Sequence, residues 1–254
     1  MEYVKYIDVE NLQRDYLKQT GRCLAVLDAI RELVRNGKYT EQEPSYPRDI
    51  VYDRENFMKA VENSLIPVRV SGTKKAEDSS LIPENFDLFT FKELKYSPQN
   101  MHPHSCFDLI YQYRGESVLH YDQLQQTIHE GEMILLGPMS SYMIEKEPES
   151  SIIMTTYIRQ KMMNRSFFDV ISTDGIIAGF IRNILLDIDD PNFIILKGNN
   201  VSEMQRIVQK VFIETNYPDP HSPKAAVYWA RLLFISPNLH HVAVSSLIYL
   251  LFCS

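Results

Sequence analysis

The sequence predicts an α+β protein in which a block of short strands lies between two helical segments. Residues 8–36 carry apolar side chains three, four or seven positions apart, which is typical of an amphipathic helix. Residues 86–159 alternate apolar and polar side chains in short runs, which is typical of strands. After residue 161 the helical spacing returns. Many short strands in succession favour a sandwich or a barrel.

Two signals bound the first predicted helix. Asp8 is the expected N-cap, since its carboxylate can accept hydrogen bonds from first-turn amides, and Gly37 is the expected stop. A stretch with prolines and tyrosines follows, and a short helix is expected from Arg54 to Asn63. Residues 1–70 are therefore predicted to form an N-terminal helical extension. The polar residues 71–84 are predicted to be a linker.

The predicted strand block spans residues 85–160. Its clearest strand alternates polar neighbours with Phe107, Leu109, Tyr111 and Tyr113. Gly115 is expected in a turn, and Asp122 in a tight hairpin. Further strands are expected at 118–121, 124–128, 133–136, 141–144 and 152–159. This order of strands and turns predicts one compact β-structure.

Amphipathic helices are predicted in residues 161–234. The first has Asp174 as its expected cap and Pro191 as its end, and the last begins at Ser222-Pro223, a capping hydroxyl before proline. Their apolar stripes contain Ile177, Phe180, Ile181, Ile184, Leu185 and Ile188, then Met204, Val208, Val211 and Phe212, then Ala226, Trp229, Leu232 and Leu233. Such stripes pack on a core, on a partner helix or on both.

Residues 235–254 form an atypical tail. Its apolar run, 247–252, is shorter than the roughly 20 residues that cross a bilayer, so no membrane anchor is expected. A truncated or frame-shifted end is the preferred explanation. The three cysteines are too widely spaced for a disulfide framework or a metal knuckle, and no secretory signal precedes them. The cytoplasm is therefore the expected compartment.

The net charge of the chain argues against a nucleic-acid-binding surface. Its 26 Lys and Arg residues against 33 Asp and Glu residues leave a formal net charge of −7. Nucleic-acid binding needs clustered basic side chains. This chain is therefore not expected to bind DNA by itself.

The most informative stretch begins at His102-Pro103-His104 and continues to Gly115. In a strand, alternate side chains point to one face, and these residues share the parity expected to face a barrel interior: His102, His104, Cys106, Asp108, Ile110 and Gln112. The stretch resembles the first cupin motif, with Asp108 in place of the usual Glu. The resemblance predicts a cupin-like double-stranded β-helix barrel, or jelly roll, at residues 85–160.

A second stretch, Gly131 to Pro138, resembles the second cupin motif as regulators carry it: an acidic Gly turn, an apolar strand and a Pro-containing bend. The position of the final metal-binding His then falls on Tyr142, and tyrosine is a poor substitute for a neutral imidazole. With the helices that follow, residues 85–234 resemble the sensory domain of AraC-family transcription regulators. The helix-turn-helix part of that family has no counterpart here, and the N-terminal helix is an addition to the cupin plan.

The resemblance implies an effector-sensing and dimerising domain with no catalytic residue, no metal and no cofactor. The implied ligand-binding residues are His102, His104, Asp108, Gln112 and Tyr142. The implied homodimer interface contains Val208, Val211, Phe212, Trp229, Leu232 and Leu233. The expected partners are a small-molecule effector, a sugar being the family's most familiar one, and a second copy of the chain. DNA is expected only through a domain absent from this sequence, and no membrane partner is expected.

Three alternatives stay open at this stage. His102, His104 and Asp108 are three side chains that can ligate a metal, which would suit a cupin enzyme of the isomerase or dioxygenase type. The two histidines would otherwise lie at the barrel mouth with no ligand, and the helical stripes would only pack on the barrel. A defective gene product that merely self-associates is the third alternative.

Overall fold

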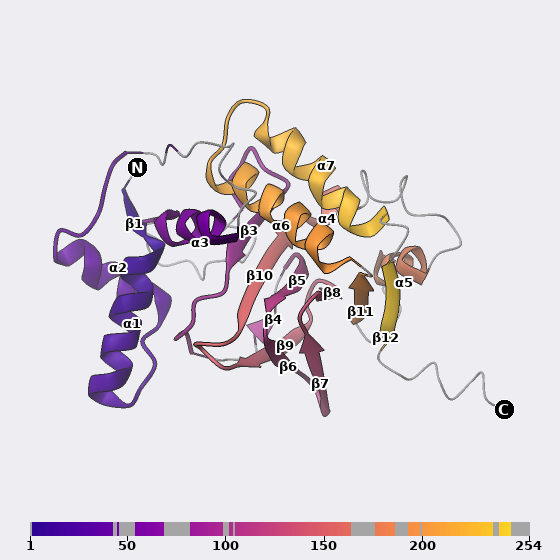
Figure 1. Ribbon diagram of the computed structural model, residues 1–254, viewed down its shortest axis with the longest axis horizontal. Coiled ribbons are helices and arrows are strands. Elements are labelled where there is room, and N and C mark those ends of the chain that lie inside the picture. Colours follow the sequence, from indigo (N-terminus) through magenta and orange to yellow (C-terminus); the bar gives the residue numbers. More distant parts are fainter. Residues whose placement is uncertain are drawn as a thin grey trace.

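The computed structural model describes residues 2–42, 45, 54–68, 82–98, 102–103, 105–163, 176–185, 193–198, 200–235 and 239–244. Antiparallel sheets lie at the centre, with the N-terminal helices at one side and two long helices across one face (Figure 1). The predicted α+β class is therefore confirmed.

The elements follow one another along the chain as helices, then strands, then helices with two more strands. Their bounds are β1 (Tyr3–Lys5), α1 (Tyr6–Thr20), α2 (Val26–Arg35), α3 (Arg54–Asn63), β2 (Leu65–Pro67), β3 (Leu88–Lys92), β4 (His102–Pro103), β5 (Phe107–Arg114), β6 (Glu116–Tyr121), β7 (Leu124–His129), β8 (Glu132–Leu136), β9 (Ser141–Lys146), β10 (Ile152–Ile158), α4 (Gln160–Met162), α5 (Ile176–Leu185), β11 (Phe193–Gly198), α6 (Val201–Asn216), α7 (Ser222–Ile235) and β12 (Leu239–Val244).

Two antiparallel sheets form the β-structure. The larger has the strand order β12-β11-β8-β5-β10-β3, and the smaller has the order β4-β9-β6-β7. Within the described residues no strand ladder joins one sheet to the other, so the predicted closed barrel is not confirmed. The two sheets instead form a sandwich, because a buried apolar cluster contains residues of both: Ile110, Leu119, Ile128, Ile134, Leu136, Tyr142, Ile153, Phe193 and Ile195.

The strand β5 divides its side chains between two cores. Ile110 belongs to the cluster between the sheets. Its odd-numbered neighbours belong to a second cluster on the face that the helices cover: Phe107, Leu109, Tyr111 and Tyr113. The predicted alternation of this strand is therefore confirmed, and every residue from Phe107 to Tyr113 is buried.

Helices α3 and α6 close the second core over the sheet. The ring of Phe57 in α3 lies 5.6 Å from that of Tyr113 and 5.4 Å, edge-on, from that of Phe212 in α6. Such aromatic pairs add stability beyond the area that they bury. Asn200 caps α6 by accepting a hydrogen bond from the amide of Glu203. These contacts fix α6 against the strands that carry the inward-facing polar residues.

The predicted single helix over residues 8–36 is wrong. Gly21 takes the left-handed conformation, with φ of 68°, so the chain leaves the helix there and resumes it at Val26. Asp8 does not cap the helix, because α1 begins two residues earlier and Asp8 lies in its first turn. Gly37, with φ of 69°, follows the end of α2 as expected.

The sequence did not predict the strands β11 and β12. The run Phe193-Ile194-Ile195-Leu196 is apolar throughout, because β11 lies between β8 and β12 and both of its faces are covered. β12 extends the sheet with residues of the predicted tail. By contrast, α3 begins and ends where predicted, and the hairpin turns at Asp122. Asp174, Ile188, Pro191 and residues 71–81 and 245–254 lie outside the described residues.

The helices that the structure describes include none that is both long and apolar enough to span a membrane.

Gly115 and Gly37 offer a matched test of the turn between β5 and β6. Both have φ near 70°, but a Cβ on Gly115 would lie 2.6 Å from the backbone oxygen of Ser150, whereas one on Gly37 would meet nothing within 4 Å. We expect Gly37→Ala to cost about 1 kcal/mol of unfolding free energy through its backbone conformation alone. Gly115→Ala should cost about 1–3 kcal/mol more, because backbone must move. Urea unfolding measures both, and equal losses would contradict the placement of this turn.

Candidate functional site

A buried hydrogen bond joins the two sheets at one end of the sandwich. The hydroxyl of Tyr142 in β9 donates to Oδ2 of Asp108 in β5 at 2.6 Å. The exposed fractions are 1% for Asp108 and 8% for Tyr142. Burial raises the pKa of Tyr142 well above its ordinary value, and the neighbouring Asp108 raises it further. The phenol therefore stays a hydrogen-bond donor throughout the neutral range.

The histidines of the first motif are only partly described. His102 pairs through its backbone with Tyr142, where β4 meets β9. Its side chain, and the whole of His104, lie outside the described residues. Cys106 precedes β5, packs in the helix-side core and directs its Sγ at Oδ1 of Asp108, 3.5 Å away. Of the predicted ligand residues, the structure thus brings Asp108, Tyr142 and the backbone of His102 together.

Gln112 lies two inward positions further along β5 and is engaged by its own chain. Its amide nitrogen donates to the carbonyl of Arg114 at 2.7 Å and to Oγ of Ser151 at 2.9 Å, and its Oε1 accepts from Ser117 at 2.7 Å. Both amide hydrogens are therefore used. Gln112 thus joins the end of β5 to Ser117 in β6 and to Ser151 just before β10. It lies apart from Asp108, with Ile110 between them.

Strand register adds inward residues that the sequence did not single out. Tyr157 of β10 pairs with both Asp108 and Phe89, and Thr155 pairs with both Ile110 and Phe91. Directly opposed residues of an antiparallel ladder point to one face, so these side chains share the face of Asp108. Tyr157 also belongs to the large cluster that the helices cover, and Phe89 and Phe91 pack against that cluster. Because β3 is an edge strand, its two phenylalanines are only half-buried. The run Leu88 to Phe91 alternates too little between polar and apolar residues, so the sequence alone does not show which of its side chains face inward.

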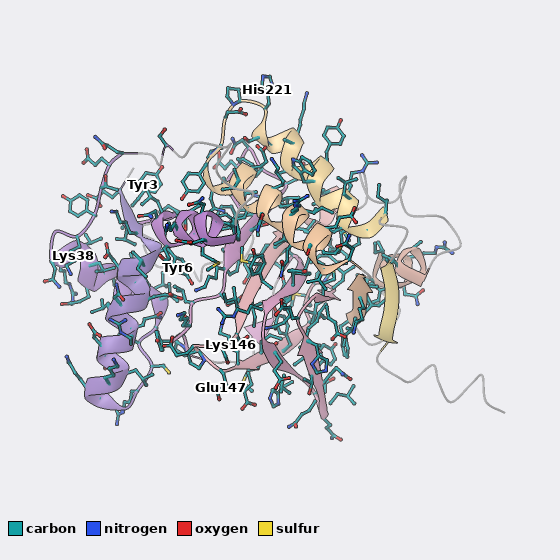
Figure 2. All side chains as sticks on the ribbon, in the orientation of Figure 1. Tyr3, Tyr6, Lys38, Lys146, Glu147 and His221 are labelled. Carbon is teal, nitrogen blue, oxygen red and sulfur yellow. The ribbon has the colours of Figure 1, made fainter. Side chains whose placement is uncertain are left out.

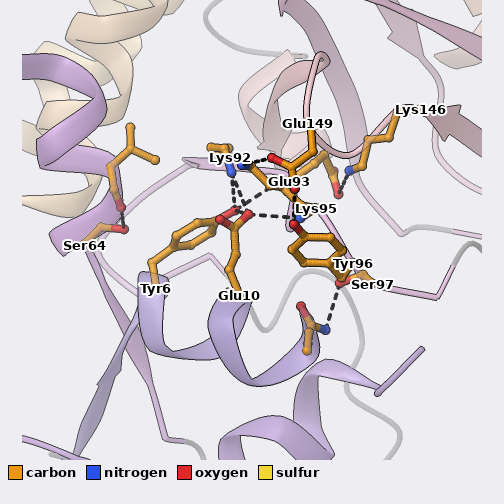
Figure 3. A network of polar contacts seen from close by, with 12 residues as sticks. Tyr6, Glu10, Ser64, Lys92, Glu93, Lys95, Tyr96, Ser97, Lys146 and Glu149 are labelled. Atoms are coloured by element: carbon orange, nitrogen blue, oxygen red, sulfur yellow. Dashed lines mark hydrogen bonds and ion pairs between the residues drawn. The ribbon is translucent and has the colours of Figure 1, made fainter. Parts of the chain in front are cut away.

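Lys146 lies at the other end of β9 and faces the same side as Tyr142. Its side chain is 9% exposed, and its Nζ lies 3.9 Å from Oε2 of Glu93 (Figure 3). Oε1 of Glu93 accepts from the hydroxyl of Thr155 at 2.8 Å. Burial lowers the pKa of Lys146, and Glu93 opposes that shift. Figure 2 places Lys146 at the end of the sheet beside the N-terminal helices.

A second buried lysine ties β3 to the first helix. Nζ of Lys92 contacts Oε1 of Glu10 at 2.7 Å and the hydroxyl of Tyr6 at 2.9 Å, and both partners lie in α1 (Figure 3). Tyr6 also donates to Glu10 at 2.7 Å, and the amide of Lys95 donates to Glu10 at 3.0 Å. Lys92 has the opposite parity to the half-buried phenylalanines of β3, so its side chain lies on the other face of the strand. The contacts of Lys92 with Tyr6 and Glu10 hold α1 in place beside the inward face.

Most residues of the predicted dimer interface lie in the core of the chain itself. The exposed fraction is 3% or less for Val208, Val211, Phe212 and Leu233. Trp229 is partly buried, and the ammonium of Lys210 lies 5.6 Å from its ring centre. Leu232 is 37% exposed. The exposed apolar residues of α7 are Tyr228, Leu232 and Ile235, which share one side of the helix.

Within the described part of the chain, no group of three His, Cys, Asp or Glu side chains is placed to hold a metal ion. The metal-enzyme alternative depends on His102 and His104, whose side chains are outside that part.

We expect Tyr142→Phe to lower the unfolding free energy by about 1.5–3 kcal/mol, because a buried carboxyl loses its phenol donor. Tyr121→Phe is the control, since Tyr121 pairs with Tyr142 across the ladder and is partly buried. Urea unfolding at pH 7 measures both. A Tyr142→Phe loss no greater than that of the control would contradict the role of this bond.

The same variant has a signature in alkaline solution. The raised pKa of Tyr142 means that the folded chain keeps a proton that the unfolded chain loses, so stability falls as the pH rises above 10. One such group contributes a slope of up to about 1.4 kcal/mol per pH unit. Between pH 10 and 11 the unfolding free energy of Tyr142→Phe should therefore fall less steeply than that of the parent chain.

Comparisons with known proteins give structural likeness alone. No protein-family model and no curated protein matches the chain. A crystal structure of an apo ToxT variant from Vibrio cholerae is similar over 59% of this chain and 51% of its own, with 16% identity and a TM-score of 0.38. A structure of wild-type ToxT from the same organism, with an unsaturated fatty acid bound, has the same coverage and TM-score, with 11% identity.

The AraC-like transcriptional activator CuxR is similar over 65% of this chain and 56% of its own, with 11% identity and a TM-score of 0.32. The chain thus spans about half the length of the solved structures that it resembles.

Proposed function

We propose that this chain is the effector-sensing part of an AraC-type bacterial transcription regulator. The observation that carries the proposal is the buried pair of Asp108 and Tyr142, which bridges the two sheets where the motifs predict effector-binding residues. Such a regulator binds a small-molecule effector and does not convert it. A separate domain contacts the DNA. The cytoplasm, which holds the DNA, is the compartment that this role implies.

The inward face has the composition of a ligand site. Small-molecule sites are mainly apolar, with a few polar groups that fix orientation. Here Ile110, Leu119 and Ile134 supply apolar surface between the sheets, and Asp108 and Tyr142 supply a carboxyl and a phenol. The cupin-like barrel that the motifs predict remains part of this proposal.

A physical connection leads from the inward face to the helices. β3 carries Phe89 and Phe91 on its inward side, and α6 hydrogen-bonds to the backbone of Thr90 between them. The amide of Thr90 donates to Oγ1 of Thr215 at 3.3 Å, and Asn216 donates to the carbonyl of Thr90 at 2.8 Å. An effector that shifted β3 would therefore shift α6. An allosteric response requires that the effector bind the two resulting conformations with different affinities.

The response can be tested in a fusion of the whole chain to the DNA-binding domain of a characterised AraC-type regulator. Sugars, small carboxylic acids and unsaturated fatty acids would be screened on a reporter gene. We expect one class to change reporter output by roughly 5- to 150-fold, the range of ordinary allosteric coupling. Asp108→Asn should abolish the response.

The matched control is Asp122→Asn, at an exposed hairpin turn whose φ of 51° asparagine tolerates. A reporter that ignores every compound, or an Asp108→Asn fusion that responds like the parent, would contradict the proposed function.

The proposal includes a homodimer through the exposed side of α7, with Leu232 as its central contact. We expect the purified chain to sediment as a dimer and Leu232→Glu to sediment as a monomer, because a charge would be buried in an apolar interface. Leu27→Glu is the control, since Leu27 is a 50% exposed leucine on α2. A monomeric parent chain, or a dimer that survives Leu232→Glu, would exclude this interface.

A further inference from the structure

One stripe of α1 is polar and yet buried. Tyr6, Glu10 and Gln13 follow one another at helical spacing, and their exposed fractions are 4%, 5% and 0%. A surface helix normally turns apolar side chains inward and polar ones to solvent. Burial of a polar side chain is costly unless a partner compensates it. Beyond α1 itself, this stripe finds its partners chiefly in the segment from Lys92 to Ser97 (Figure 3).

The contacts follow that segment along its length. Oε1 of Glu10 accepts from Nζ of Lys92 at 2.7 Å and from the amide of Lys95 at 3.0 Å. One turn further along α1, the side chain of Gln13 donates to the hydroxyl of Ser97 at 3.3 Å. Lys92 is the last residue of β3. The helix α1 therefore holds the chain at the point where it leaves β3.

The helix α6 holds the middle of the same strand. The amide of Thr90 donates to Oγ1 of Thr215 at 3.3 Å, and its carbonyl accepts from the side chain of Asn216 at 2.8 Å. Two residues of an extended strand span about 7 Å, so these contacts lie close to those of Lys92. Among the described strands β3 pairs with β10 alone, so its position depends on both helices as well as on one ladder.

We propose that α1 is a regulatory clamp on β3 and that α6 is coupled to it through this strand. Docked α1 holds β3 in the position at which Thr90 meets α6, and release of α1 loosens β3 and the last turn of α6 together. A partner that bound the N-terminal helices would then act on α6 without entering the sandwich. The clamp does not depend on which effector the sandwich binds.

The joint between α1 and β3 can open while the surrounding cores stay packed. The N-terminal helices have a separate apolar cluster that includes Val9 and Leu33, and to which the segment after β3 adds Leu94. The joint also contains the buried ion pair of Glu10 and Lys92. Such a pair contributes little net stability, because desolvation offsets much of the attraction. Opening of the joint should therefore cost less free energy than unfolding of either core.

The test is amide hydrogen exchange of the full chain, resolved by mass spectrometry. Glu10→Gln leaves the buried Lys92 without its counter-charge, so exchange in residues 88–97 should rise by about tenfold, which corresponds to about 1.4 kcal/mol. Exchange in residues 211–217 should rise with it, because the last turn of α6 is bound to β3. The hairpin of β6 and β7 should keep the parent rate.

The matched control is Glu55→Gln. Glu55 also lies in a helix and pairs with a lysine, Lys59, at 2.8 Å, but it is 76% exposed. An exposed pair of this kind contributes little, so exchange in β3, in the end of α6 and in the hairpin should equal that of the parent.

A second variant approaches the coupling from the other end. Coupling between two sites is reciprocal. Asn216→Ala removes the hydrogen bond from α6 to the carbonyl of Thr90. Exchange in the segment from Lys92 to Ser97 should therefore rise as well, although Asn216 has no hydrogen bond to that segment.

Three results would overturn the proposal. Faster exchange of Glu10→Gln that stays within residues 88–97 would mean that α6 is not coupled to the clamp. An equal rise at every protected amide, the hairpin included, would mean a general loss of stability. Parent-like exchange of the segment from Lys92 to Ser97 in Asn216→Ala would contradict the reciprocity that coupling requires.

Discussion

The whole structure depends on the burial of β5 between two cores. Its residues from Phe107 to Tyr113 are all buried, so each side chain must find a partner on one side or the other. The odd-numbered side chains are apolar or aromatic and pack under the helices, which explains why α3 and α6 lie across this face. The even-numbered ones face the smaller sheet, and two of them are polar. Burying polar groups is costly unless they are hydrogen-bonded, and this requirement brings Tyr142 to Asp108 and three partners to Gln112.

The segment from Lys92 to Ser97 joins parts of the chain that are far apart in sequence. On one side it binds α1, through Lys92, the amide of Lys95 and the hydroxyl of Ser97, which accepts from Gln13. On the other side it binds the turn after β9, where Tyr96 and Lys95 contact Glu149. Figure 3 shows these contacts as one network. The N-terminal helices are therefore not an isolated extension but are held against the sheets by buried charge.

Lys92 and Lys146 differ in how closely each is paired with a carboxylate. Burial lowers the pKa of each lysine, and a carboxylate opposes that shift in each case. Lys92 obtains direct hydrogen bonds in return, so removal of its partner Glu10 would leave a buried charge unpaired. Lys146 obtains only a long ion pair.

Local patterns in the sequence determined much of this protein. The alternation from Phe107 to Tyr113, the hairpin at Asp122 and the helix from Arg54 to Asn63 depend on side-chain period and turn chemistry, which neighbouring residues decide. The parity that groups Asp108 with Gln112 has the same origin. Tertiary structure alone decided the helix break at Gly21, the pairing of β11 with β8 and β12, and the place of β3 at the edge of its sheet. Tertiary structure also decided the ion pair of Lys146 with Glu93. These residues are 53 positions apart, and no local sequence pattern predicts their contact. Burial and strand order are properties of the packed chain, so no local pattern contains them.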